Sequence, residues 1–104
     1  MEKIKRICIC GGGGLGHTCA AVLSSHDDVE VMLYTQHPER WNKTFVVDDC
    51  ENRIYNGRIV SITNKPEEVV PFADLVLLCL PAFLVEKTLI EIQPLLSSRT
   101  IVGS

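Results

Sequence analysis

The chain has 104 residues, which is enough for one small domain with a hydrophobic core. Its 46% hydrophobic and 22% charged residues are typical of a folded globular protein. The net charge of −3 provides no basic surface for nucleic acid or for an anionic membrane. The longest apolar run, at residues 75–85, is too short to span a bilayer, and glycines interrupt the first apolar run too early for a signal peptide. We therefore expect a cytoplasmic protein with no nucleic-acid or membrane partner.

A glycine-rich loop follows the first predicted strand. Residues 4–10 predict a strand and residues 14–25 a helix, and G-x-G-x-x-G at residues 11–16 joins the two. In that context the pattern is typical of a dinucleotide-binding loop, because its glycines allow a sharp turn, a close approach to a pyrophosphate and tight packing of the helix on the strand. The helix amino terminus then faces the phosphates. We predict that the loop binds a pyrophosphate through Gly11, Gly13, Gly14, Leu15 and Gly16. The alternative is a flexible glycine turn that binds no ligand.

The second predicted strand, residues 29–34, follows a turn at Asp27 and Asp28. An acid commonly ends this strand and binds the adenosine ribose, but no carboxylate stands at residues 34–37. Thr35 can instead donate a hydrogen bond to a ribose hydroxyl or a 2′-phosphate, and Arg40 can pair with that phosphate. A solvated surface arginine is the equally weighted alternative for Arg40. The cofactor is therefore expected to be NAD or NADP, with the choice open.

The middle of the chain predicts short elements. Residues 38–42 predict a helical turn, and residues 45–47 and 53–56 predict the two arms of a hairpin. A third parallel strand is expected at residues 59–62, followed by a brief helix at residues 66–70. Asn64 is the expected N-cap of that helix and Pro71 its end. Trp41 is expected in the core or at a subunit contact, with the wall of an adenine pocket as its alternative.

The fourth predicted strand, residues 75–80, is apolar throughout, as expected for a central parallel strand that is covered on both faces. A helix at residues 83–96 and a strand at residues 100–102 follow. The loop after the fourth strand adjoins the point where the strand order reverses, where ligands bind in open α/β sheets. We predict that Leu80, Pro81 and Ala82 form an apolar cofactor wall; the alternative is that Pro81 only ends the strand.

Strands that alternate with helices predict an α/β fold: a Rossmann-type, doubly wound parallel sheet with three layers in a single domain. The expected strand order is 3-2-1-4-5. A sixth strand is missing from the pattern, so we interpret residues 1–104 as the truncated, N-terminal NAD(P)-binding domain of a longer enzyme.

Cysteine and histidine residues do not form a metal or catalytic motif. The five cysteines include no C-x-x-C pair, and Cys8 and Cys10 should face the same side of their strand. Buried free thiols are the favoured interpretation over zinc ligands or disulfides. The spacing of the three histidines does not indicate a functional site, and no nucleophile can be paired with a general base. We therefore assign neither a catalytic residue nor a metal ligand within the chain.

Six short segments together resemble the amino-terminal domain of opine (octopine and nopaline) dehydrogenases. They are CICGGG at residues 8–13, HT at 17–18, DVEV at 28–31, ERW at 39–41, PAF at 81–83 and IVG at 101–103. They occur in order along nearly the whole chain, and the insertion at residues 45–58 is also similar to that family's. The match is therefore more specific than the glycine loop alone.

The resemblance implies an NAD(P)H-dependent reductive condensation, in which an amino acid and a 2-oxo acid form an imine that hydride reduces to a secondary amine. It implies that Gly11, Gly13 and Gly16 lie at the pyrophosphate and that Pro81 and Ala82 lie on the nicotinamide side. It also implies that the catalytic histidine–aspartate pair lies in a C-terminal domain beyond this chain. Residues 1–104 alone are then expected to bind cofactor weakly at best and not to turn over.

Other functions remain open from the sequence. A ketopantoate or glycerol-3-phosphate reductase would have a similar amino-terminal domain, and a stand-alone nucleotide-sensing module would be complete at about this length. A flavin enzyme is disfavoured because Thr35 stands where flavin folds usually have an acid. The last strand, residues 100–102, and the apolar surface around Phe83 and Leu84 also predict self-association, because an uncovered strand edge can pair with another chain.

Overall fold

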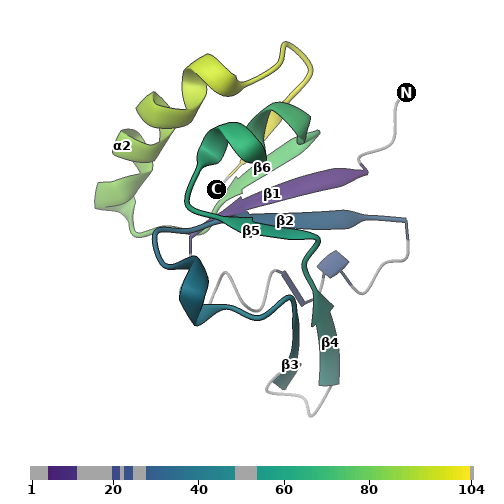
Figure 1. Ribbon diagram of the computed structural model, residues 1–104. Helices are drawn as coiled ribbons and strands as arrows, with labels where there is room; N and C mark the ends of the chain where they lie inside the picture. Colours follow the sequence, from purple (N-terminus) through teal and green to yellow (C-terminus); the bar gives the residue numbers. More distant parts are fainter. Residues whose placement is uncertain (1–4, 12–19, 22, 25–27, 49–53, 104) are drawn as a thin grey trace.

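The computed structural model describes residues 5–11, 20–21, 23–24, 28–48 and 54–103. Its main sheet has five parallel strands in the order β5-β2-β1-β6-β7, which is the predicted order 3-2-1-4-5 (Figure 1). The strands are β1 (Arg6–Cys10), β2 (Glu30–Tyr34), β5 (Ser61–Thr63), β6 (Leu75–Leu78) and β7 (Ile101–Gly103). The predicted Rossmann-type α/β fold is confirmed.

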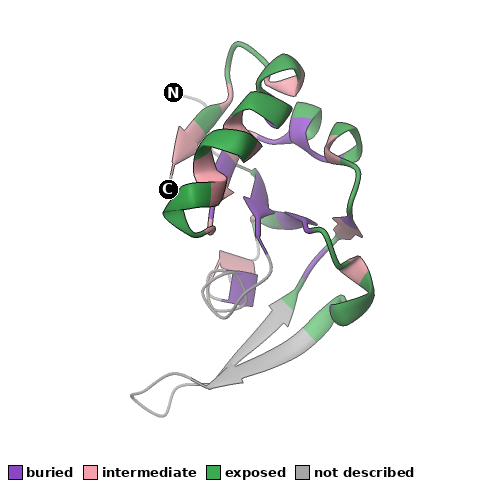
Figure 2. Ribbon diagram, turned by 90° about the vertical axis from the view of Figure 1, so that its left-hand side faces the viewer, coloured by how far each residue is buried: buried purple, intermediate pink, exposed green. Residues whose placement is uncertain are grey.

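Apolar side chains alternate between the two faces of the central strands and build two separate cores. Cys8 and Cys10 of β1 face one core, as predicted, and Ile7 and Ile9 face the other. Figure 2 shows this burial concentrated in the strands at the centre of the molecule. Elements pack on both faces of the sheet: the first core includes Val69, Val70 and Ile92, and the second includes Ala20, Trp41 and Ile59. This arrangement produces the three layers that the sequence predicts.

Helix α2 (Ala82–Ile92) is shorter than the predicted helix at residues 83–96. A 3₁₀ helix, η4 (Gln93–Leu95), follows it directly, with a proline near its start. The cause is Pro94, which has no N–H for an α-helical bond and whose ring disfavours the preceding turn. In the first predicted helix, residues 20, 21, 23 and 24 are helical, and the other positions from 14 to 25 lie outside the described residues.

The predicted hairpin forms a second, two-stranded antiparallel sheet that projects from the main one (Figure 1). Strand β3 (Thr44–Asp48) is one residue longer than predicted at each end. Strand β4 (Ile54–Arg58) extends two residues past its predicted end. The 3₁₀ helix η1 (Pro38–Arg40) precedes it, and it confirms the helical turn predicted from the proline. The hairpin therefore begins immediately after a short turn that follows β2.

The third parallel strand is displaced from the predicted residues 59–62. The Ile59 N–H donates to the Lys43 carbonyl at 2.7 Å, so Ile59 still belongs to the base of the hairpin, and β5 begins at Ser61. The predicted brief helix consists of two 3₁₀ helices, η2 (Pro66–Glu68) and η3 (Val70–Phe72). Lys65 rather than Asn64 is the residue at the first N-cap, and no side chain caps it. Pro71 lies inside η3 because proline suits the first turn of a helix.

The carboxyl half of the sheet ends in an exposed edge. Strand β6 stops at Leu78, two residues before its predicted end, and β7 pairs with β6. Ile101 of β7 is 56% exposed and Phe83 of α2 is 80% exposed.

Self-association through these surfaces stays a prediction. Light scattering over a concentration series of the chain should show mass rising with concentration, and a constant monomeric mass would contradict the prediction.

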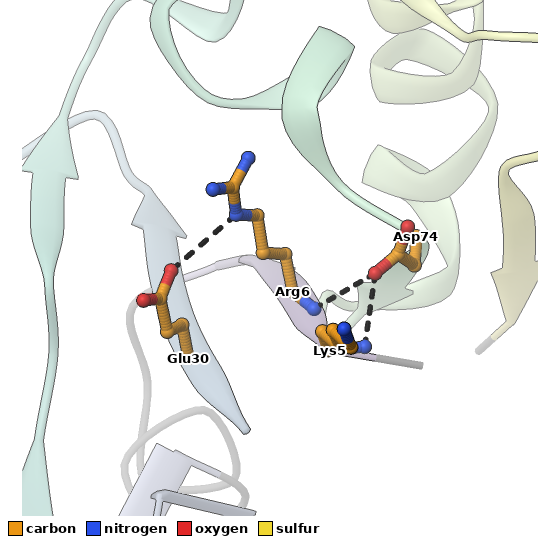
Figure 3. A network of polar contacts seen from close by, with 4 residues as sticks. All are labelled: Lys5, Arg6, Glu30 and Asp74. Atoms are coloured by element: carbon orange, nitrogen blue, oxygen red, sulfur yellow. Dashed lines mark hydrogen bonds and ion pairs between the residues drawn. The ribbon is translucent and has the colours of Figure 1, made fainter. Parts of the chain in front are cut away.

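Asp74 joins the start of three strands (Figure 3). Its carboxylate Oδ2 accepts the backbone N–H groups of Lys5 and Arg6, both at 2.9 Å, and its carbonyl accepts the Ile101 N–H at 3.0 Å. The two N–H bonds to the carboxylate hold the pKa of Asp74 below its usual range. The nearby Arg6–Glu30 ion pair, 3.4 Å between Nε and Oε2, is exposed on both sides and contributes little.

Replacing Asp74 with asparagine should make the chain less stable in a pH-dependent way. Because the folded pKa is the lower one, the carboxylate stabilises the fold above the unfolded pKa of about 3.9, and this stabilisation is lost as pH falls through the folded value. The urea midpoints of wild type and Asp74→Asn should differ at neutral pH and converge in acid. Glu67→Gln, an exposed change on η2, is the control. A difference that stays constant with pH would contradict the assignment.

Candidate functional site

Gly11 lies where three strands converge at the carboxyl edge of the sheet. It follows β1 directly, and its N–H donates to the carbonyl of Tyr34 at the end of β2 at 3.0 Å. Its φ of +141° belongs to backbone space that is open essentially to glycine. A Cβ at this position would lie 2.3 Å from the carbonyl oxygen of Cys79, which follows β6. Gly11 therefore allows the chains leaving β1, β2 and β6 to approach one another.

A cavity of about 1040 Å³ opens at this edge of the sheet. The residues that follow β1, β2, β5 and β6 form one side, and α2 forms the other. The sheet side contributes Cys10, Gly11, Tyr34, Thr35, Gln36, His37, Arg40, Trp41, Asn64, Cys79, Leu80 and Pro81. The helix contributes Leu84, Lys87, Thr88 and Glu91. The cavity thus spans both sides of the point where the strand order reverses, which is the usual ligand position in this type of sheet.

Two polar residues predicted at the end of β2 lie in this cavity. Thr35 is buried; its Oγ1 accepts the His37 N–H at 3.3 Å and its own N–H donates to the Thr63 carbonyl at 3.0 Å. Arg40 is exposed on η1 and also lines the cavity. His37 forms an exposed pair with Glu39, 3.3 Å from Nδ1 to Oε1. The end of β2 therefore presents a fixed hydroxyl and an accessible guanidinium.

The other predicted positions differ in how far the structure describes them. Leu80 and Pro81 line the cavity after β6, whereas Ala82 begins α2 and is not among the lining residues. Gly13, Gly14, Leu15 and Gly16 lie outside the described residues. Trp41 packs in the core, as expected by default, and it lines the cavity as well. The cofactor roles of all these residues stay predictions.

The sequence analysis missed a hydrogen-bonded group between β2 and α2. The Tyr34 hydroxyl donates to the Glu91 carboxylate and accepts the amide of Gln36 at 3.1 Å. Burial, reinforced by the bond to Glu91, raises the pKa of Tyr34 above its usual value, so the phenol stays protonated. Leu84, Thr88 and Glu91 follow the i, i+4, i+7 spacing of one helix face, but this spacing does not show that the face meets the cavity.

Cysteines contribute apolar surface to the site. Cys8 and Cys10 are free thiols, and Cys10 and Cys79 line the cavity. The hydrogen bond with Cys10 and burial raise the pKa of Cys8, which keeps that thiol neutral. Cys19 and Cys50 lie outside the described residues. Within the described part of the chain, no three His, Cys, Asp or Glu side chains gather to hold a metal ion, and no helix is long and apolar enough to cross a membrane.

Known proteins share this fold and align with nearly the whole chain. An opine dehydrogenase from Haliotis discus hannai is 31% identical over 119 residues, a match that covers 99% of this chain and 29% of the relative. A structure of octopine dehydrogenase with NADH and agmatine superposes with a TM-score of 0.83 at 30% identity, covering 95% of this chain and 28% of that one. A structure of octopine dehydrogenase with NADH and pyruvate has a TM-score of 0.85 at 29% identity, with coverages of 94% and 28%.

The chain therefore spans less than a third of the length of these relatives. The resemblance to opine dehydrogenases that the sequence indicates is confirmed. The model of the family described as ketopantoate reductase PanE/ApbA matches residues 7–104, which agrees with the reductase alternative and with the shared fold of both groups. Because that match covers nearly the whole chain, this protein belongs to the ketopantoate reductase PanE/ApbA family, with opine dehydrogenases among its relatives.

Proposed function

We propose that these 104 residues are the amino-terminal, nicotinamide-dinucleotide-binding domain of a longer opine-type dehydrogenase. The observation that carries the proposal is the cavity at the carboxyl ends of β1, β2 and β6, with Gly11 among its lining residues. The cofactor supplies hydride when bound. In the whole enzyme, this hydride would reduce the imine formed from an amino acid and a 2-oxo acid, the chemistry that the family resemblance implies.

The cavity has suitable groups for each part of a dinucleotide. The end of β2 offers the Thr35 hydroxyl and the Arg40 guanidinium to the adenosine ribose, since that ribose is bound beside the second strand in this fold. Leu80 and Pro81 offer an apolar wall on the β6 side for the nicotinamide ring. Lys87 of α2 adds a second cation to the cavity lining, which favours an anionic ligand. NADH is the cofactor that we propose, because octopine dehydrogenase binds it in both matching structures.

Calorimetry on the intact protein tests the proposal. The intact protein is the full-length polypeptide that contains these residues. NADH should bind at one site per chain, and Gly13→Val should weaken it strongly, because a branched side chain would occupy the position predicted for the pyrophosphate. Wild-type protein that does not bind NADH would contradict the proposal. Unchanged affinity in a folded Gly13→Val variant would contradict the role of the loop.

Activity assays separate the proposed reaction from its alternatives. The intact protein should oxidise NADH when pyruvate and an amino acid are both present, and neither substrate alone should suffice. Oxidation with ketopantoate would instead favour the reductase function of the family that the chain matches. Binding of NADH without turnover of any of these substrates would favour a nucleotide-sensing module. Residues 1–104 alone should not turn over, because the family resemblance implies that the catalytic histidine–aspartate pair lies in a C-terminal domain beyond them.

Arg40→Ala should weaken NADPH more than NADH. Only NADPH carries a 2′-phosphate that can pair with the guanidinium, and the loss of a charged hydrogen bond costs on the order of 1.5–3 kcal/mol. Competition binding of the two cofactors to the intact protein measures the difference. Arg58→Ala is the control, because Arg58 is exposed at the end of β4 and is not among the cavity-lining residues. Equal losses for both cofactors, or none, would make Arg40 a surface residue without a cofactor role.

A further inference from the structure

A carboxylate stands in a cavity that we propose binds a phosphate-bearing ligand. Among the described lining residues, Glu91 is the one carboxylate, whereas Arg40 and Lys87 are cations. A carboxylate opposes the binding of an anionic ligand unless it accepts a hydrogen bond from a donor on that ligand. A hydrogen-bond donor of the ligand beside Glu91 would offset this repulsion.

The contacts of Glu91 place it beside the end of β2, where we propose that the adenosine ribose binds. Its Oε1 accepts the hydroxyl of Tyr34, the last residue of β2, and that hydroxyl in turn accepts the Gln36 amide at 3.1 Å. The phenol thus uses its donor on Glu91 and an acceptor lone pair on Gln36, so this group of side chains is held together before any ligand binds. Glu91 is itself exposed toward the cavity, and Oε2 is available as a further acceptor.

The end of β2 lacks the acid that usually accepts hydrogen bonds from the adenosine ribose. We propose that Glu91, positioned by Tyr34, replaces this acid: it accepts a hydrogen bond from the ribose hydroxyls and disfavours a 2′-phosphate, so that the site selects NADH against NADPH. The inference rests on the proposed function. Sequence spacing does not reveal this pair, because Tyr34 and Glu91 are 57 residues apart and belong to a strand and a helix on opposite walls of the cavity.

Cofactor selectivity in the intact protein tests the role of Glu91. In Glu91→Gln, the ratio of the NADPH Kd to the NADH Kd should fall about tenfold, because the amide keeps nearly the same shape and removes the charge that repels the 2′-phosphate. Glu86→Gln is the matched control: it removes an exposed glutamate from the same helix, outside the cavity-lining residues, and should leave the ratio unchanged.

Tyr34→Phe tests the positioning role separately. It removes the hydroxyl that holds Glu91 and should lower the same ratio by less than Glu91→Gln does, because the charge remains but is no longer fixed. A merely structural loss would weaken both cofactors equally and leave the ratio unchanged. In the double variant, Tyr34→Phe should add no further change to Glu91→Gln, because the two residues act as one unit.

The possible outcomes distinguish this inference from the proposed function. Wild-type protein that binds neither cofactor would overturn both. Wild-type protein that binds NADH, with a selectivity ratio that Glu91→Gln leaves unchanged, would overturn only the role of Glu91. A ratio that falls equally in Glu86→Gln and Glu91→Gln would show a general charge effect and would also overturn it.

Discussion

A Gly11→Ala variant should lose roughly 3 kcal/mol or more of its free energy of unfolding. Two costs add at this residue. Alanine disfavours a φ of +141°, and its Cβ would lie 2.3 Å from the carbonyl oxygen of Cys79, a residue whose N–H is bonded to the Cys10 carbonyl at 2.9 Å. Urea unfolding of the purified variant measures the loss.

Gly103→Ala is the matched control. Gly103 also ends a strand of the same sheet, but a Cβ there would meet only the flexible Leu77 Cδ2, at 3.4 Å. This variant should change stability by less than about 1 kcal/mol. A Gly11→Ala protein as stable as Gly103→Ala would mean that the chains leaving β1 and β6 do not approach each other as described.

An Ile92→Ala variant should destabilise the protein by about 3 kcal/mol, whereas Ile90→Ala should change it by less than about 0.5 kcal/mol. Both isoleucines belong to α2, but Ile92 is fully buried against the sheet and Ile90 is 65% exposed. Shortening the Ile92 side chain leaves a cavity between helix and sheet, whereas shortening the Ile90 side chain removes atoms that are largely in water.

Thermal or urea unfolding of the two variants provides the comparison. Because α2 also forms one wall of the cavity, a loosened helix in Ile92→Ala should weaken NADH binding as well. Equal effects of the two substitutions on stability would contradict the way in which α2 packs on the sheet.

The fold was predictable where local sequence decides the structure. Residues 6–10 and 30–34 form strands because apolar runs pack into both cores, and Gly11 turns the chain because no other residue suits its φ. The errors have local causes as well. Ile59 is apolar and suggests a strand, yet its N–H bonds to Lys43 in the hairpin. The helix predicted after Asn64 does start at Pro66, but its predicted N-cap was wrong, because Lys65 and not Asn64 directly precedes that proline.

The cavity was predictable in part. Thr35, Arg40, Leu80 and Pro81 follow strands, and the carboxyl ends of parallel strands meet at one edge of a sheet. Glu91 was not predictable in this way, because its place depends on how α2 crosses the sheet. That crossing is set by tertiary packing at residues such as Ile92, and spacing within the helix does not contain it.

Energy transfer from Trp41 to bound NADH tests the central claim most directly. Trp41 is the single tryptophan among these 104 residues and lines the cavity, so dinucleotide bound there lies within transfer range of its indole. Exciting the indole of the intact protein while NADH is added should produce saturable nicotinamide emission. In Trp41→Phe, most of this emission should disappear, while calorimetry should still detect bound NADH. Bound NADH with no emission attributable to Trp41 would contradict the account, because the cofactor would then lie outside this cavity.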